Sequence, residues 1–139
     1  MVSLKNMKQL LLICAVVALV GGCGGKKALT KEESVKVIEA AIRKAAEKPT
    51  GELTKADLEK VMFLNLERLQ LTDVKGLEKL TQLKALYLNG NQLTDVKGLE
   101  KLTQLKALSL ADNHDLTKAQ ISELQKALPK CKIGSNPTK

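Results

Sequence analysis

The sequence predicts an α/β solenoid, a short stack of repeated coils with parallel β-strands on its concave face and caps at both ends. Three observations lead to this fold class. The segment LTDVKGLEKLTQLKAL occupies residues 71–86 and recurs unchanged at residues 93–108. The chain of 139 residues is 44% hydrophobic but has one Phe, one Tyr and no Trp, so its core must be aliphatic. Apolar residues at helical spacing lie before and after the repeat, where a short solenoid needs its ends covered.

The repeat has the pattern of a leucine-rich repeat, L-x-x-L-x-x-L-x-L-x-x-N-x-L, and its copies start 22 residues apart. The central copy fills every position, with Leu80, Leu83, Leu86, Leu88, Asn91 and Leu93. The next copy reaches its last leucine after one inserted residue, with Leu102, Leu105, Leu108, Leu110, Asn113 and Leu116. The preceding copy is divergent and has a leucine in place of the asparagine, with Leu58, Val61, Leu64, Leu66, Leu69 and Leu71. We assign residues 53–116 to the repeats.

Alternation along each short strand separates the core from the surface. In the central coil, Leu86 and Leu88 should point inward and Tyr87 outward. One coil cannot bury its apolar side alone, so the leucines of successive coils must share one core. Asn91 and Asn113 should also point inward and bond main-chain groups, because a buried polar group without a partner is costly.

The combination of Leu-Thr-Asp-Val with Gly-Leu-x-x-Leu-Thr-x-Leu closely resembles the internalin-type leucine-rich repeats of bacteria. This resemblance covers roughly residues 53–116. It implies a short 3₁₀ helix on the convex side of each coil, with Asp73 and Asp95 as capping residues ahead of Val74 and Val96. The chain has far fewer coils than the long internalins, so we do not expect a large horseshoe-shaped surface.

The N-terminal segment predicts export. Lys5 and Lys8 precede an uncharged apolar run over residues 10–20, followed by small residues. This run is shorter than the roughly 18–20 residues that a transmembrane helix needs. We therefore predict a cleaved signal peptide over residues 1–22.

The end of this segment, Val20-Gly21-Gly22-Cys23, resembles the lipobox of bacterial lipoproteins. The resemblance implies cleavage before Cys23, a diacylglyceryl group on its thiol and acylation of the new amine. Residues 23–29 would then be a flexible tether to a membrane of the bacterial cell envelope. The alternative is an ordinary cleavage site in which Cys23 is merely one of the small residues.

Residues 30–52 predict a helical N-terminal cap. Thr30 and Glu33 have the spacing of a capping box, and the following apolar residues recur at helical spacing: Val35, Ile38, Ile42 and Ala45. The helix should stop by Lys48, because Pro49 disfavours helical backbone before it. Thr54, with Asp57 three residues later, should start a second short helix that turns Leu58 and Val61 into the first coil.

Residues 117–139 predict a C-terminal cap made of a helix, a last strand and a tail. Thr117 and Gln120 form another capping box, and three apolar residues share one helix face: Ile121, Leu124 and Leu128. Alignment of residues 128–133 with 105–110 places Cys131 beside Leu108 and Ile133 beside Leu110. Cys131 should then point inward as a small hydrophobic residue with a raised pKa. The alternative is a reactive or metal-binding thiol.

The outward strand positions should form three columns across the concave face. The first column is Phe63, Ala85, Ala107 and Lys130. The second is Asn65, Tyr87, Ser109 and Lys132. The third is Glu67, Asn89 and Ala111. The two similar coils differ at four positions of this face and its turn, where a binding surface would diverge. Neutral drift at solvent positions explains the same differences. We take the partner-binding candidates to be Phe63, Asn65, Glu67, Tyr87, Asn89, Ser109, Lys130 and Lys132.

Phe63 and Tyr87 are the preferred anchors of this surface, because aromatic rings supply large, rigid contact areas at binding hot spots. The alternative is that Phe63 packs under the N-terminal cap and Tyr87 is an isolated surface ring.

Catalysis has little support in this sequence. The sole histidine, His114, lies in the turn with the inserted residue, and no nucleophile, base and orienting partner converge. Metal-ligand spacing, a phosphate-binding loop and an aromatic-interleaved basic stripe are also missing. We predict no catalytic activity, cofactor, metal, small-molecule substrate or nucleic-acid partner.

The predicted function is therefore that of a monomeric, lipid-anchored module that binds an unknown protein partner. The second interpretation uses the like charges that a 22-residue spacing stacks: Lys75 with Lys97, Lys79 with Lys101, and Lys84 with Lys106. These lysine ladders would make the chain a structural or polyanion-binding envelope lipoprotein.

Overall fold

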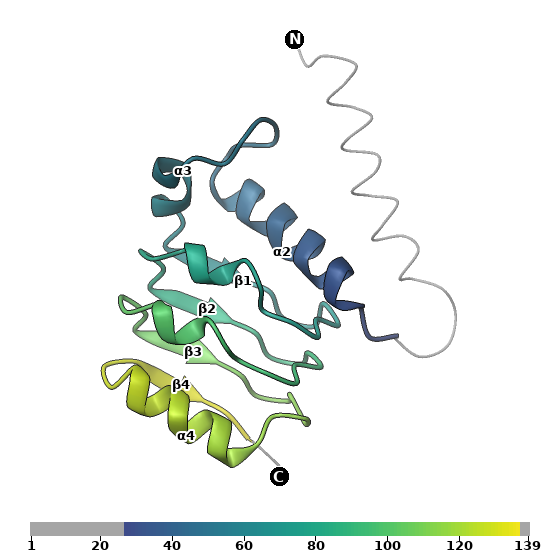
Figure 1. Cartoon of the computed structure of the whole chain (residues 1–139), viewed down its shortest axis with the longest axis vertical. Coiled ribbons are helices and arrows are strands. Elements are labelled where there is room, and N and C mark those ends of the chain that lie inside the picture. Colours follow the sequence, from purple (N-terminus) through teal and green to yellow (C-terminus); the bar gives the residue numbers. More distant parts are fainter. Residues whose placement is uncertain (1–26, 137–139) are drawn as a thin grey trace.

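A computed structural model describes residues 27–136 as one stack of coils capped at each end (Figure 1). Its helices are α2 (Lys31–Ala45), α3 (Lys55–Glu59) and α4 (Lys118–Ala127), with two short 3₁₀ helices, η1 (Leu77–Lys79) and η2 (Leu99–Lys101). Its strands are β1 (Phe63–Asn65), β2 (Ala85–Tyr87), β3 (Ala107–Ser109) and β4 (Lys132–Gly134). They form one parallel sheet in the order β1-β2-β3-β4. The predicted solenoid is confirmed. The signal segment, Cys23 and its lipidation lie outside the described residues.

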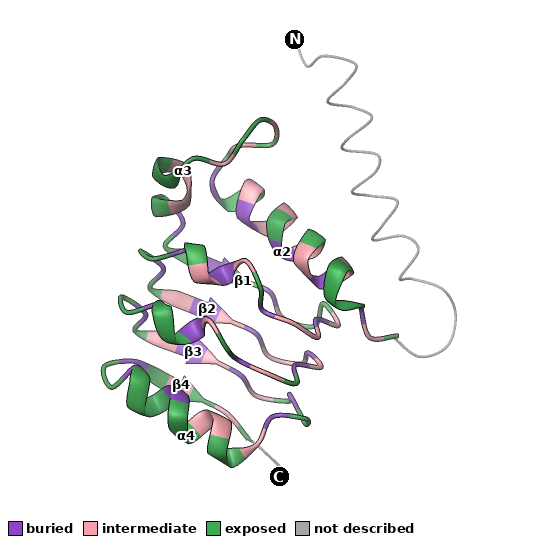
Figure 2. Cartoon of the chain, in the orientation of Figure 1, coloured by how far each residue is buried: buried purple, intermediate pink, exposed green. Residues whose placement is uncertain are grey.

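The core is a column of leucines contributed by successive coils. Leu64 lies beside Leu86 and Leu86 beside Leu108 in neighbouring strands, and all three are buried. Figure 2 shows buried residues within strands β1, β2 and β3 and within each 3₁₀ helix of the stack. Full burial of a leucine side chain contributes roughly 1.5–3 kcal/mol, so this shared column is the main source of stability.

The inward asparagines hold adjacent coils together. The Asn91 amide donates to the carbonyls of Leu66 and Leu88, at 2.8 and 2.9 Å, and its Oδ1 accepts from the N–H groups of Leu69 and Leu71. Asn113 repeats the arrangement one coil later and donates to Leu88 and Leu110. The predicted main-chain pairing of both amides is confirmed.

The convex side carries the 3₁₀ helices that the resemblance implied, but their capping differs. Gly76, in the left-handed region with φ of 103°, precedes η1, and its N–H bonds the Glu78 carboxylate. Asp73 instead accepts from the Lys75 N–H in the turn before the helix. The aspartate therefore stabilises the turn and does not cap the helix directly.

Leu69 does not take the inward place that the pattern gives it. Its side chain is 37% exposed, and the flanking Arg68 and Gln70 both have positive φ. Asn91 of the next coil already bonds the Leu69 N–H, so the backbone turns the side chain of Leu69 outward.

The N-terminal cap is α2, which packs beside β1 at the start of the stack (Figure 1). The capping box of Thr30 and Glu33 is confirmed, and the helix ends before Lys48 as predicted. Its buried face is rotated from the predicted stripe, because Ser34 is buried, Val35 is half-buried and Ala45 is exposed. The buried Ser34 hydroxyl accepts from the Thr72 N–H, a partner that spacing along the helix cannot reveal.

Leu29 belongs to the folded domain and not to the tether predicted for residues 23–29. It is buried, its N–H donates to the Gln70 carbonyl at 2.9 Å, and its own carbonyl accepts from the Thr72 hydroxyl. The chain is thus attached to the first coil before α2 begins.

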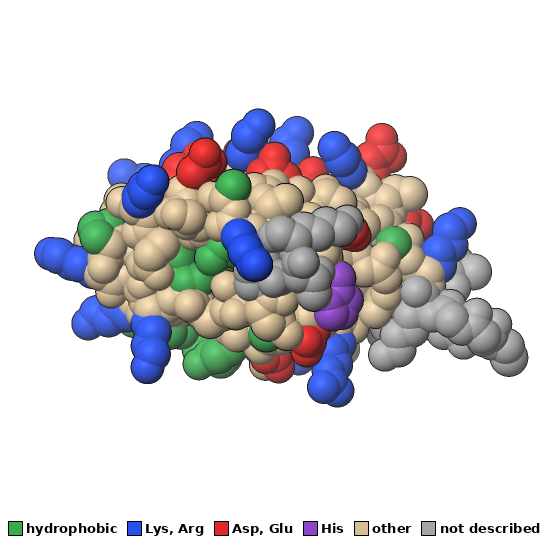
Figure 3. Space-filling view, turned by 90° about the horizontal axis from the view of Figure 1, so that it is seen from below, with side chains coloured by type: hydrophobic (Ala, Val, Ile, Leu, Met, Phe, Trp, Pro, Cys, Tyr) green, Lys and Arg blue, Asp and Glu red, His purple; other side chains and the backbone are tan. Residues whose placement is uncertain are grey.

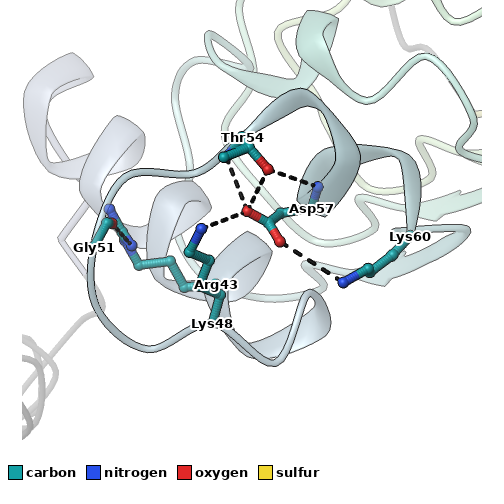
Figure 4. Close-up of polar contacts among 6 residues, drawn as sticks. All are labelled: Arg43, Lys48, Gly51, Thr54, Asp57 and Lys60. Atoms are coloured by element: carbon teal, nitrogen blue, oxygen red, sulfur yellow. Dashed lines mark hydrogen bonds and ion pairs between the residues drawn. The ribbon is translucent and has the colours of Figure 1, made fainter.

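The second short helix, α3, starts at a capping box of Thr54 and Asp57, as predicted. Figure 4 shows the Asp57 carboxylate at the centre of a polar cluster. Lys48 lies 2.7 Å from it, the Thr54 hydroxyl and N–H donate to it, and Lys60 lies 3.8 Å away. The hydrogen bond from Lys48, with those from Thr54, holds the pKa of Asp57 well below its ordinary value.

At the C-terminal end, α4 begins at the predicted capping box of Thr117 and Gln120. The predicted register of the last strand is wrong by two residues, because Ile133 lies beside Leu108 and not beside Leu110. A two-residue shift keeps each side chain on the same face of a strand. Cys131 therefore still points inward, as predicted, at 3% exposure, and burial raises the pKa of its thiol. Within residues 27–136, no helix is both long and apolar enough to cross a membrane.

Candidate binding surface

The outward side chains of the four strands form the concave face, which we define by three columns. Phe63, Ala85 and Ala107 lie side by side in the first column, as predicted. Asn65, Tyr87 and Ser109 do so in the second.

The predicted last member of both columns is wrong, because β4, the strand of the fourth coil, pairs with β3 in another register. Lys132 lies beside Ala107 and so ends the first column, while Gly134 lies beside Ser109 and ends the second. Lys130 is exposed in the turn before β4 and belongs to neither column. The loop between α4 and β4 differs in length from the repeat, so an alignment of leucines could not place this strand.

The two aromatic rings of the described chain meet on this face. The centroids of Phe63 and Tyr87 are 5.4 Å apart and their planes are tilted by 53°. Phe63 is 55% exposed, so it does not pack under the N-terminal cap, and Tyr87 is not an isolated ring. Tilted aromatic pairs at this distance attract each other, so the pair is a preformed apolar contact area.

The third column is a hydrogen-bonded chain centred on Asn89. Its amide donates to the Glu67 carboxylate, and its Oδ1 accepts from the Ser109 hydroxyl and from the Ala111 N–H at 3.1 Å. Asn65 extends the chain by accepting from the Glu67 N–H at 3.0 Å. These bonds hold four polar side chains in one arrangement, which lowers the entropic cost of binding a partner there.

The two ends of the strands differ in charge. Lys84 and Lys106 come directly before β2 and β3, whereas the depression beyond the other end of the strands is lined by both signs, from Glu67, Arg68 and Asp112.

Sequence reasoning missed two parts of this surface. Met62, directly before β1, is 52% exposed beside the aromatic pair. Asn136 donates to the Asp112 carboxylate and accepts from the Asp112 N–H at 2.6 Å. In the two preceding coils a main-chain carbonyl, that of Asn89 or Ala111, accepts the equivalent N–H. A polar residue near the end of the chain is too weak a signal to identify such a substitution.

The convex side presents mixed charge rather than a uniformly basic ladder. One shallow depression is lined by both signs: Asp73, Lys75, Glu78, Asp95, Lys97, Glu100 and Lys101. Figure 3, seen along the stack from its C-terminal end, shows basic and acidic side chains interleaved along the upper edge. The described residues contain no group of three or more His, Cys, Asp or Glu placed to hold a metal ion.

A family match and one solved structure support the fold. Residues 81–126 match the family described as Leucine Rich repeats (2 copies). An internalin (inlF) from Listeria monocytogenes has a similar structure, with 25% sequence identity and a TM-score of 0.61, over 73% of this chain and 31% of that one. Internalin C2 from the same organism matches at 22% identity and a TM-score of 0.49, over 71% of this chain and 54% of that one. The chain thus spans less than a third of the first internalin. No curated protein sequence matches it.

Proposed function

We propose that this leucine-rich-repeat domain is a non-catalytic module that binds a protein partner through its concave face while lipidated Cys23 holds it at a bacterial membrane. The observation that carries the proposal is the ordered surface on that face. An exposed aromatic pair lies beside a hydrogen-bonded chain of polar side chains, which is the composition of a protein-binding hot spot and its rim.

The second interpretation, polyanion binding by stacked lysines, is less well supported. Lys75, Lys97 and Lys101 share their depression with four carboxylates, and Lys97 lies 3.9 Å from Asp95. A polyanion would meet acidic groups there as well as basic ones, so binding would be weakened by like-charge repulsion.

Site-specific photocrosslinking in intact bacterial envelopes tests the concave face. A photoreactive amino acid at position 87 or 109 should crosslink one protein partner, and the same residue at position 101 on η2 should not. Tyr87→Ala should weaken binding of that partner about tenfold or more, with little change between 50 and 300 mM salt. Crosslinks from position 101 alone, or a steep loss of binding with salt, would favour the lysine ladders.

Fractionation of the Cys23→Ala variant tests the anchor. We expect the variant to leave the membrane fraction, because stable attachment needs two or more lipid chains and this variant carries none. Full membrane retention of the variant would contradict the lipid anchor without affecting the concave-face proposal.

A further inference from the structure

An open apolar groove separates the C-terminal half of α2 from β1. We call it the cap groove and define it by the residues that line it: Ala41, Lys44, Ala45, Lys60, Val61, Met62, Phe63, Leu64 and Asn65. Its volume is about 580 Å³. Two of the three exposed large hydrophobic residues in the described chain, Met62 and Phe63, lie here. Adjacent exposed apolar side chains of this kind mark interaction sites.

The groove also contains a free sheet edge. β1 is the first strand of the sheet and pairs only with β2. The hydrogen bonds to the second coil use the Met62 carbonyl and the Leu66 and Arg68 N–H groups. Main-chain groups alternate in direction along a strand, so those of Phe63 and Asn65 point away from β2, toward the groove. A free edge of this kind is a template for an added strand.

The charged side chains that line the groove are both basic. Lys44 lies on the helix side and Lys60 on the strand side, and both are exposed. Lys60 approaches Asp57 only to 3.8 Å and is 66% exposed, while Asp57 receives its short contacts from Lys48 and Thr54. The rim therefore favours acidic groups on whatever occupies the groove.

We propose that the cap groove binds an extended segment of a partner protein that alternates apolar and acidic side chains, added as a strand to the free edge of β1. Because successive side chains of a strand point to opposite faces, an alternating segment gathers its apolar side chains on one face, beside Phe63, and its carboxylates on the other, for pairing with the two lysines that line the groove. This second surface goes beyond the concave-face function, with which it shares Met62, Phe63 and Asn65.

Selection of random dodecapeptides displayed on phage, with the full chain in detergent micelles as the target, tests the proposal. We expect selected peptides to alternate apolar residues with Asp or Glu. Ala45→Trp, which fills the groove from the exposed last residue of α2, should weaken binding of the selected synthetic peptide at least about tenfold in fluorescence anisotropy. Ala127→Trp, at the equally exposed last residue of α4, is the matched control and should leave the affinity unchanged.

The contributions of the two lysines and of main-chain hydrogen bonding to peptide binding are tested separately. Lys44→Glu with Lys60→Glu should abolish binding of the acidic peptide, and Lys97→Glu with Lys101→Glu should not. A peptide N-methylated at alternate positions should bind at least about tenfold more weakly, because it cannot donate to the edge of β1.

Four results would overturn the proposal: no selected peptide, peptides without acidic residues, equal binding to both tryptophan variants, or binding that N-methylation leaves unchanged. Thermal melting of each variant verifies its fold, and the lysine pair decides the outcome if Ala45→Trp melts early. Ser109→Arg, outside the groove, should block the concave face only, so the two proposals can fail independently.

Discussion

The central coil and the first coil of the stack follow the same pattern but are stabilised differently. The central coil has its own inward asparagine, Asn91, whereas the first coil has Leu69 at that place, turned outward. The first coil nevertheless has its main-chain groups satisfied, because Asn91 reaches back to Leu66, Leu69 and Leu71. Each asparagine therefore serves its own coil and the preceding one, so the first coil does not need an asparagine of its own.

The two ends of the stack also depend on groups outside the repeated coils. The Gly90 N–H donates to the Ala111 main-chain carbonyl one coil later, whereas the Asp112 N–H donates to the side chain of Asn136, which follows β4. An N–H group facing the next coil needs a substitute acceptor at the C-terminal end. The first coil instead needs a cover for its apolar side, which α2 supplies.

The largest expected effect comes from removing core volume in the central coil. Leu86→Ala should lower the free energy of unfolding by about 2–5 kcal/mol, because Leu86 is fully buried and the neighbouring strands cannot close the cavity. Leu69→Ala in the first coil should cost less than about 1 kcal/mol, because that side chain is already turned outward. Urea denaturation of both variants measures the difference, and equal losses would show that the two leucines are equivalent after all.

The next effect tests whether one asparagine serves two coils. Asn91→Ala should cost about 2–4 kcal/mol, because it leaves the N–H groups of Leu69 and Leu71 and the carbonyl of Leu66 without their side-chain partner. Asn113→Ala should cost less, since its Oδ1 accepts one main-chain bond, from Leu93 at 3.2 Å. Hydrogen exchange at the Leu69 and Leu71 amides should accelerate in the Asn91 variant alone. Unchanged exchange of these two amides would show that Asn91 does not stabilise the first coil.

A smaller effect tests the cover of the first coil. Thr30→Ala removes the side-chain cap of α2 and should cost about 1 kcal/mol. Thr117→Ala removes the equivalent cap of α4 and should cost a similar amount. Amide exchange distinguishes the two, because the first variant should expose the Leu29 amide and the second the Leu128 amide. If both variants accelerated exchange of the same amide, the two helix caps would not stabilise separate ends of the stack.

The smallest effect is a pH dependence of the N-terminal region. The pKa of Asp57 is lower in the folded chain than in the unfolded chain, so its stabilising contribution is complete at neutral pH and is lost as acid protonates it, from about pH 5 downward. Asp57→Asn should therefore be less stable at neutral pH and lose less stability on acidification. Urea denaturation at several acidic pH values measures the slope. Lys48→Met should flatten it as well, and an unaltered slope in both variants would exclude this cluster as its source.

Much of the fold could be predicted because its signals are local or strictly periodic. The capping boxes at Thr30, Thr54 and Thr117 need only a few adjacent residues, and an unchanged repeat brings Leu86 beside Leu108 wherever the chain forms coils. The inward position of Cys131 was also accessible, since the alternation of a strand survives a shift of two residues.

The candidate surface was only partly predictable. Phe63, Tyr87, Asn89 and Ser109 were assigned to the concave face by their strand positions. Their mutual contacts, and the place of Lys132 beside Ala107, depend on distances between coils and on the loop before β4. No periodic pattern encodes those distances, because they result from packing side chains of different sizes.

The sequence by itself determined which side of each coil is apolar, because burying leucines at a regular spacing has one economical solution, a stack of parallel strands. Only the tertiary structure decided what happens where the repeat stops. Three features depend on segments that are distant in the chain. They are the outward side chain of Leu69, the pairing of Asn136 with Asp112, and the cap groove between α2 and β1. Which group pairs with an unpaired main-chain N–H, or packs near an exposed apolar side chain, depends on the three-dimensional packing of the coils. The residues adjacent in the sequence do not specify that packing.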